Sequence, residues 1–241
     1  MDNMSPPALR CAGVAKSYRR MTVLHDASLE VGAGECVGLV GVNGAGKTSL
    51  LRCVLDLVAV DRGTIEIFGI DHRQPTARAA LAFLPERFAP PWYMTGAEFI
   101  RHLLRLHGLA PAPAGVEEAL RSLELDREAL QRQVRHYSKG MTQKLGLAAF
   151  LLIGKPLCVL DEPASGLDPK ARALFKDALR GLGRQGRAVL FTSHNLQDVE
   201  ELCDRIVVLH GGHVRFSGTP SDCRARYDAG SLEQAFLRCF E

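Results

Sequence analysis

The stretch "GVNGAGKTS", residues 41–49, constrains the fold of this chain more than any other segment. It follows the pattern G-x-x-x-x-G-K-[ST], in which glycines let the backbone wrap closely enough for its N–H groups to point at phosphate oxygens. The continuous apolar run "CVGLV" precedes it and the helical pattern "KTSLLRCVLDL" follows it. A helix that begins directly after such a loop adds its positive end to the site. The stretch therefore predicts a phosphate-binding loop between a buried strand and a helix.

Strand and helix patterns alternate over much of the chain. Strands are predicted at "LRCAGVA", "ASLEV", "GTIEIFG", "ALAFLPE", "PLCVLDEP", "AVLFTSH" and "RIVVLH", and helices from Pro169 and at "NLQDVEELC". The pair Gly211–Gly212 predicts a hairpin after the last of these strands. This alternation predicts an α/β fold with a mostly parallel sheet and helices packed on it.

The middle of the chain has a helical pattern instead. Thr95 and Glu98 form a capping-box pattern, and Asp126 is predicted to cap a second helix after the proline-rich "APAPAG". We therefore expect one domain over 1–241, with a core at 8–86 and 153–220 and an inserted helical lobe at 87–152. The tail, 221–241, is predicted to be a short amphipathic helix, and no function is assigned to it.

Composition excludes several classes of protein. The formal net charge of +3 is too small to indicate nucleic-acid binding by itself. The N-terminal "MDNMSPPALR" lacks the apolar run of a signal peptide, and the longest apolar run, "LGLAAFLLIGKPLCVL", is interrupted before it reaches the ~18 residues of a span. Seven scattered cysteines show no metal-binding spacing, which favours a reduced cytosol; Cys36 and Cys158 lie in apolar runs and are predicted to be buried.

Polar residues that could take part in catalysis or ligand binding follow two of the predicted strands. Asp161 and Glu162 come at the end of "CVLDEP", and strand alternation predicts that their side chains point to different sides. Asp161 suits Mg²⁺, whereas Glu162 is suited to polarise an attacking water as a general base. His194, in "TSHN", is predicted at the carboxyl edge of the sheet, where it would contact a γ-phosphate.

The stretch "YSKGMTQKL" predicts a helix whose first turn carries no acidic residue. Ser138 can cap this helix, and Lys139 and Lys144 stand where Asp or Glu would usually neutralise its positive end. Basic residues also dominate residues 127–155, where Glu128 is the single acid. Two interpretations remain open, a solvated basic face and a local field for an anionic ligand.

With these motifs in place, the chain resembles the ATP-binding subunit of an ATP-binding cassette (ABC) transporter from about Leu9 to Pro220. In that family "GVNGAGKTS" is the Walker A loop, "LCVLDEP" the Walker B strand, "SGLDP" the D-loop and His194 the switch histidine. "YSKGMTQKL" stands in place of the signature, usually Leu-Ser-Gly-Gly-Gln. The resemblance implies a P-loop NTPase-type, mostly parallel sheet core, an N-terminal antiparallel β subdomain and an inserted α-helical lobe.

The resemblance also implies ATP and Mg²⁺ as cofactors and a set of site residues. Catalytic roles fall to Lys47, Glu162 and His194, and metal contacts to Thr48, Asp161 and Glu86. Nucleotide contacts fall to Tyr18, Gly41, Val42, Asn43, Gly44, Ala45, Gly46, Lys47, Thr48, Ser49, Glu86, Ser138, Gly140 and Asp168. Tyr18 would stack on the adenine, while Ser138, Gly140 and Asp168 would act across the interface of a dimer.

The chain departs from the family pattern at three positions. Lys139 and Met141 replace a glycine and the glutamine of the signature, which puts a ribose contact in doubt. Glu86 stands where the Q-loop glutamine is usual, and a carboxylate adds negative charge beside a triphosphate. We therefore expect Glu86 to couple to the membrane partner more than to catalyse. The sequences "YSKGM" and "LPE" resemble an exporter branch.

The implied function is an ATPase that powers a separate transmembrane permease from the cytoplasmic face of the inner or plasma membrane. A second ATP-binding subunit, identical or different, would complete the dimer, and no nucleic acid is expected. Phe88 and Trp92 are candidates to dock the permease or to fill the lobe's own core. Three alternatives are a soluble cassette ATPase acting on nucleic acid or ribosomes, a small-molecule kinase, and a catalytically idle regulatory subunit. The first would carry long coiled coils or two cassettes, and the second has no use for "SGLDP".

Overall fold

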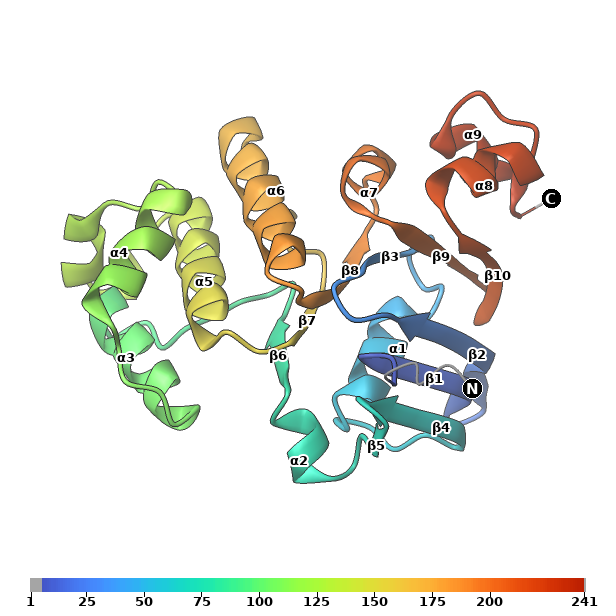
Figure 1. Ribbon diagram of the computed structural model, residues 1–241, viewed down its shortest axis with the longest axis horizontal. Helices are drawn as coiled ribbons and strands as arrows, with labels where there is room; N and C mark the ends of the chain where they lie inside the picture. Colours follow the sequence, from blue (N-terminus) through green and yellow to red (C-terminus); the bar gives the residue numbers. More distant parts are fainter. Residues whose placement is uncertain (1–5, 241) are drawn as a thin grey trace. The chain divides into compact units, whose positions relative to one another are not determined.

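The computed structural model describes residues 6–240, which form two compact units, each described by itself below (Figure 1). The first unit comprises the chain up to Leu81, Lys155–Asp161 and the chain from Leu182 onward. The second comprises Ala82–Gly154 and Glu162–Gly181. The predictions of no leader at Met1 and of a helical tail to Glu241 reach residues that lie outside the described range. The expected boundaries of core, lobe and tail stay a prediction.

An antiparallel sheet in the first unit is built from four strands. They are β1 (Leu9–Tyr18), β2 (Met21–Val31), β4 (Arg62–Ile67) and β5 (Ile70–Asp71), in the order β2-β1-β4-β5. Each neighbouring pair is antiparallel. Val14, Leu24 and Ile65 are buried, so one face of the sheet carries part of the core. The antiparallel β subdomain is confirmed.

The second sheet of the first unit is mostly parallel. Five of its strands lie wholly in the first unit: β3 (Cys36–Val40), β7 (Leu157–Leu160), β8 (Ala188–Ser193), β9 (Arg205–His210) and β10 (His213–Gly218); β6 is the remaining strand (Leu81–Leu84). β3 pairs in parallel with β8 and β9, β7 pairs in parallel with β8, and β10 closes an antiparallel hairpin with β9. Every residue of β3, β7 and β8 is buried, as continuous apolar runs predict for strands covered on both faces.

Among the described residues, five helices lie wholly within the first unit. They are α1 (Lys47–Val54), α2 (Pro75–Arg78), α7 (Leu196–Leu202), α8 (Pro220–Arg226) and α9 (Leu232–Arg238). The prediction of one helix in the tail is wrong, because α8 and α9 are separate (Figure 1). Each has its own N-cap: Thr219 forms a capping box with Asp222, and the Ser231 side chain accepts from Gln234 N. Between them Asp228 takes a φ of 47°, which ends helical geometry.

The second unit is helical. It contains α3 (Gly96–Leu106), α4 (Pro113–Ser122), two short 3₁₀ helices at Arg127–Gln131 and Val134–His136, α5 (Lys139–Ile153) and most of α6 (Pro169–Arg184). β6 begins at Leu81, which ends the first segment of the first unit, and continues into the second unit. The Thr95–Glu98 capping box at the start of α3 is confirmed.

The prediction that Asp126 caps the second helix is wrong. α4 begins earlier, inside the proline-rich stretch, with Pro113 in its first turn. Proline suits that position because its fixed φ is already helical and no N–H is needed there. Asp126 precedes the first 3₁₀ helix and makes no side-chain capping bond.

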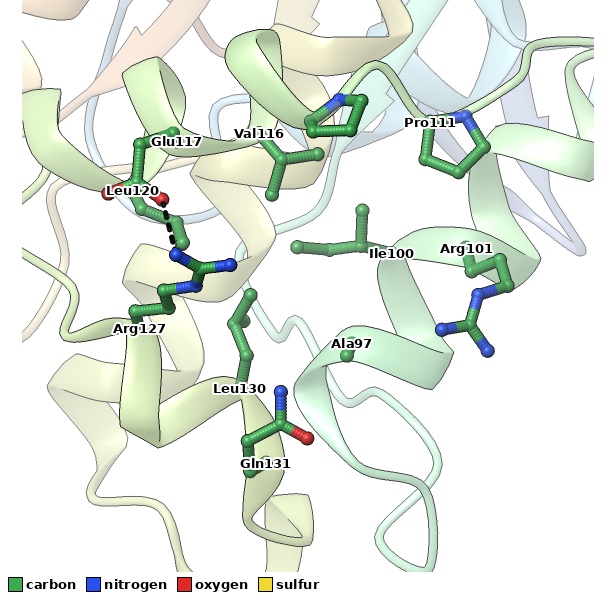
Figure 2. Close-up of a pocket in the computed structure, with 11 residues that line it drawn as sticks. Ala97, Ile100, Arg101, Pro111, Val116, Glu117, Leu120, Arg127, Leu130 and Gln131 are labelled. Atoms are coloured by element: carbon green, nitrogen blue, oxygen red, sulfur yellow. Dashed lines mark ion pairs between the residues drawn. The ribbon is translucent and has the colours of Figure 1, made fainter.

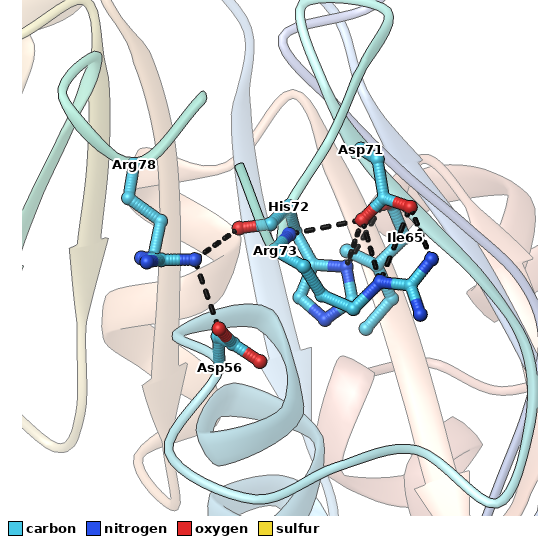
Figure 3. Close-up of polar contacts among 6 residues, drawn as sticks. All are labelled: Asp56, Ile65, Asp71, His72, Arg73 and Arg78. Atoms are coloured by element: carbon cyan, nitrogen blue, oxygen red, sulfur yellow. Dashed lines mark hydrogen bonds and ion pairs between the residues drawn. The ribbon is translucent and has the colours of Figure 1, made fainter. Parts of the chain in front are cut away.

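A polar network in the first unit ties α2 to the antiparallel sheet (Figure 3). Arg78 Nη1 donates to Asp56 Oδ2 at 2.9 Å and to the carbonyl oxygen of His72 at 2.8 Å. Arg73 donates to Asp71 and holds the pKa of that carboxyl well below its usual value. His72 is buried, with Nδ1 3.1 Å from the carbonyl oxygen of Ile65. The network holds the segment between β5 and β6 and includes no predicted site residue.

The cysteines behave as apolar residues. Cys36 and Cys158 are buried, as predicted. Burial raises the pKa of Cys53 and Cys158 to about 11, so both thiols stay protonated at neutral pH and are poor nucleophiles. Within residues 6–240 no helix has both the length and the apolar character needed to cross a bilayer.

Candidate functional site

The glycine-rich loop adopts a conformation that its glycines alone permit. β3 ends at Val40 and α1 begins at Lys47. Gly44 and Gly46 take φ values of 82° and 109°, a region that residues with a Cβ rarely adopt. A Cβ added to Gly44 would meet no atom within 4 Å, so the loop faces open space at this point.

The β9–β10 hairpin supports the loop from the opposite side. A Cβ added to Gly41 would lie 2.3 Å from the carbonyl oxygen of Leu209, so only glycine fits there. Gly212 N donates to the carbonyl oxygen of Ala45 at 3.2 Å. The loop is therefore clamped by backbone on one side and open on the other, which is the arrangement a phosphate cradle needs.

Lys47 directs its charge into the loop. The side chain is only 8% exposed, and Nζ donates to the carbonyl oxygen of Gly41 at 2.7 Å and of Val42 at 3.3 Å. These carbonyl bonds hold the ammonium against the backbone of the loop. The predicted phosphate-contacting lysine is thus already inside the cradle.

The side chains of Thr48 and Asp161 meet in the first unit, although 113 residues separate them. Thr48 Oγ1 donates to Asp161 Oδ2 at 3.3 Å. Thr192 Oγ1 donates to the other carboxylate oxygen, Oδ1, at 2.7 Å, and both Asp161 and Thr192 are buried. Two hydroxyls therefore orient one carboxylate at the end of β7, beside the loop that holds Lys47.

Sequence reasoning missed Thr192. A signal was present, because the residue lies in "TSH" beside His194, at the edge where β8 ends. In the parallel pairing of β7 with β8, Leu160 lies opposite Phe191. The next residues, Asp161 and Thr192, therefore lie side by side where the two strands end. This register is not readable from the chain alone.

Thr192→Val is expected to lower the free energy of unfolding by about 2 kcal/mol, because a hydrogen bond to a buried charged group is lost while the volume is kept. Thr192→Ser keeps the hydroxyl and should cost only ~1 kcal/mol for the lost methyl group. Urea unfolding of both variants and the parent measures the difference. Equal losses in the two variants would mean that the hydroxyl does not matter.

The residues at the loop fit a triphosphate with Mg²⁺. Among the described residues no group of three or more His, Cys, Asp or Glu side chains is placed to hold a metal ion. Mg²⁺ does not need such a cluster, since it usually keeps several waters and takes one or two protein oxygens together with phosphate oxygens. The Thr48 hydroxyl and the Asp161 carboxylate are oxygen ligands of that kind, and the open side of the loop at Gly44 has room for phosphates.

The remaining predicted residues are divided between the units. Tyr18 and His194 belong to the first unit, where both are exposed. The side chain of Tyr18, 37% exposed, carries the Lys16 ammonium 5.6 Å from its ring centroid. In the second unit lie Glu86, Ser138, Gly140, Glu162 and Asp168. Asp161 and Glu162, adjacent in sequence, thus fall on either side of the boundary between the units.

The start of α5 has the character predicted from "YSKGMTQKL". Ser138 is the N-cap and its side chain accepts from Met141 N at 3.2 Å, while the first turn contains no acidic residue. A Cβ on Gly140 would find only Ser138 Oγ, 4.0 Å away, so this turn is open to a ligand. Lys144 is engaged elsewhere, because its Nζ donates to the carbonyl oxygen of Glu124.

Comparison with known proteins identifies this arrangement. Residues 24–165 match the family described as "ABC transporter". The chain belongs to the ABC transporter family. It is an ATP-binding subunit that hydrolyses ATP to power transport, and such a subunit works with a membrane permease and dimerises.

Individual relatives agree with this assignment. The chain is 35% identical over 218 residues to "Uncharacterized ABC transporter ATP-binding protein YdbJ" of Bacillus subtilis (strain 168), covering 88% of this chain and 69% of that protein. It is 37% identical over 222 residues to "Nod factor export ATP-binding protein I" of Paraburkholderia xenovorans (strain LB400), covering 90% and 73%. The solved "Structure of ATP binding subunit of ABC transporter" superposes with a TM-score of 0.89 at 30% identity, covering 97% of this chain and all of that one.

In this ABC subunit the D-loop aspartate has a local bonding role. Asp168 Oδ1 accepts from Ala171 N at 2.8 Å, in the first turn of α6. Negative charge is favourable near a helix N-terminus, and this hydrogen bond fixes the direction of the Asp168 carboxylate. The trans contact of Asp168 stays a prediction.

The two aromatic candidates for permease docking differ. Phe88 packs inside the lobe, where its ring would lie 2.7 Å from a Cβ on Gly146 and meets Phe99 edge-on at 5.5 Å. Trp92 is 62% exposed and lies edge-on to the half-exposed Tyr93 at 5.7 Å. Phe88 therefore serves the lobe's core, and Trp92 remains the docking candidate.

A pocket of about 250 Å³ lies in the helical lobe and is lined by no predicted site residue (Figure 2). Its walls include Ile100 of α3, Val116 and Leu120 of α4, and Leu130 of the first 3₁₀ helix. Arg127 and Glu117 form a 4.0 Å ion pair on one side. The pocket plays no part in the nucleotide site.

Proposed function

We propose that this subunit powers an exporter through ATP-driven closure of a dimer. Three observations at the loop carry the proposal: Lys47 bonds the loop's own backbone, Thr48 bonds Asp161, and the loop is open at Gly44. The sequences "YSKGM" and "FLPE" support the exporter branch, and so do relatives named Nod factor export ATP-binding proteins. Against a nucleic-acid ATPase, the longest helix of the described chain, α6, has 16 residues, which is shorter than the long coiled coils expected of that class.

In the proposed reaction the chain's own residues have distinct roles. Lys47 neutralises the β- and γ-phosphates, and the loop's N–H groups surround them. Thr48 and Asp161 would hold Mg²⁺, which would supply charge neutralisation when bound. Glu162 orients and polarises the attacking water, and His194 senses the γ-phosphate. Tyr18 stacks on the adenine, and Glu86 couples the site to the permease.

A second subunit completes each site. Ser138 and Gly140 of one chain address the γ-phosphate held by the loop of the other, with Asp168 at the same interface. The unneutralised N-terminus of α5 and the open position at Gly140 support this arrangement, because a triphosphate is attracted to a helix N-terminus that no carboxylate screens. Closure on ATP and opening after hydrolysis form the two-state element that drives the permease at the cytoplasmic face of the membrane.

Complementation between two inactive variants tests the shared site. Ser138→Arg disables the signature and Lys47→Ala disables the loop, so each variant alone should be inactive. A mixed dimer contains one site with both an intact loop and an intact signature. Random mixing should therefore restore about a quarter of the parent's ATPase rate, measured with the permease present. Mixtures as inactive as their components would contradict a site built from two chains.

A further inference from the structure

Glu162 occupies a backbone conformation that its surroundings must maintain. Its φ is 44°, in the left-handed region, which is unfavourable for a residue with a Cβ. Such strain persists only where neighbouring groups over-determine the geometry. Two hydrogen bonds hold the backbone at this point. Ser165 N donates to the carbonyl oxygen of Glu162 at 3.0 Å. Gln143 Nε2 donates to the carbonyl oxygen of the next residue, Pro163, also at 3.0 Å.

The second of these bonds comes from a different element. Gln143 lies in α5, and Pro163 lies in the turn after β7, twenty residues further along the chain. Gln143 is 7% exposed and its bond is buried, so water cannot replace the amide if it is removed. A buried carbonyl without a donor is costly, and the turn would shift to find another.

One face of α5 approaches this turn at two points. Lys139 and Gln143 are four residues apart and therefore share a face of the helix. The Lys139 side chain passes close to Gly166, where a Cβ would lie 2.8 Å from Lys139 Cε. All these residues belong to the second unit, so the contacts are internal to it. The helix that begins with Ser138 thus also fixes the turn that begins with Glu162.

We propose that Gln143 is a positioning residue for ATP hydrolysis: its side-chain amide, by holding the carbonyl group of Pro163, sets the direction of the Glu162 carboxylate. This inference rests on the proposed role of Glu162 as general base. Gln143 does not touch the nucleotide in this role and acts only through the turn at residues 162–163.

Gln143→Met tests the proposal, because methionine keeps the length and volume but donates no hydrogen bond. The kcat for ATP should fall by about tenfold to a hundredfold, since a misplacement on the order of 1 Å can cost about a hundredfold. The KM for ATP and the Kd for a non-hydrolysable ATP analogue should stay within about twofold, because the loop around Lys47 is intact. Leu147→Met, an equally buried and volume-conserving change on the same helix, should leave kcat unchanged.

A double-variant cycle separates positioning from general damage. In a Glu162→Gln background the Gln143→Met change should have no further effect on the residual turnover, because the base it positions is gone. A similar proportional loss in both backgrounds, or a weakened Kd for the analogue, would overturn the proposal. Gln143→Leu, which is also apolar and donates no hydrogen bond, repeats the cycle if thermal unfolding shows Gln143→Met to be unfolded.

The cycle also distinguishes the two hypotheses. Parent-like turnover of Glu162→Gln would remove the proposed general base and the inference with it. A slow Glu162→Gln together with a parent-like Gln143→Met would leave the base in place and overturn the positioning role alone.

Discussion

Glu162→Gln should bind ATP with parent affinity and turn it over about 10²- to 10⁴-fold more slowly, the contribution typical of a general base. Glutamine keeps the shape of the side chain and can still fill the half-buried position after Asp161, but it cannot accept a proton from water. Single-turnover hydrolysis with the permease present measures the chemical step, and binding of a fluorescent ATP analogue measures affinity. Because ATP persists in this variant, the closed dimer should accumulate.

The control for this experiment is Glu118→Gln, an exposed carboxylate of the same unit that no proposal involves. It should turn over ATP like the parent. A Glu162→Gln protein with normal turnover would move the role of base to another group. Loss of ATP binding in Glu162→Gln would instead show that the side chain holds the nucleotide.

Lys47→Ala should lower the affinity for ATP by about tenfold to a hundredfold, since hydrogen bonds to charged groups contribute about 1.5–3 kcal/mol each. The side chain is buried inside the loop, so its removal takes away the cation nearest the position of the phosphates. Isothermal titration with ATP and Mg²⁺ measures the loss directly.

The Lys47 experiment needs a control for stability, because Nζ also bonds the loop's own carbonyl oxygens. Arg52→Ala removes an exposed cation from the same helix, α1, and should leave ATP affinity unchanged. Thermal unfolding without nucleotide shows whether the loop itself is damaged. Unaltered ATP binding by a folded Lys47→Ala protein would contradict the assignment of the loop.

Local signals predicted the site best. The loop at 41–49 is contiguous, and its glycine positions follow from the backbone geometry that a phosphate cradle needs. The capping box of Thr95 and Glu98 and the cap at Ser138 were predicted correctly for the same reason, since each acts within one turn of its own helix. Asp126 shows the limit: a residue suited to capping has no effect where Pro113 has already begun the helix upstream.

Contacts between distant segments were not predictable. Thr192 bonds Asp161 because β7 and β8 pair in one particular register, and a different register would separate the two side chains. No role was predicted for Gln143, because nothing in "YSKGMTQKL" indicates that its amide donates to the carbonyl oxygen of Pro163. The tail was expected to be one helix, and the reversal at Asp228 divides it into two.

The amino-acid sequence alone determined the family, the phosphate loop, the acidic pair after a buried strand and the alternation of strands and helices that produces a mostly parallel sheet. All of these depend on residue type and short spacing, which backbone geometry and hydrophobic periodicity translate directly into structure. Only the tertiary structure decided which side chains orient Asp161, which amide holds the turn after Glu162, and that Phe88 serves the core of its lobe. The reason is that strand register and helix packing bring together groups whose separation along the chain has no fixed relation to their separation in space.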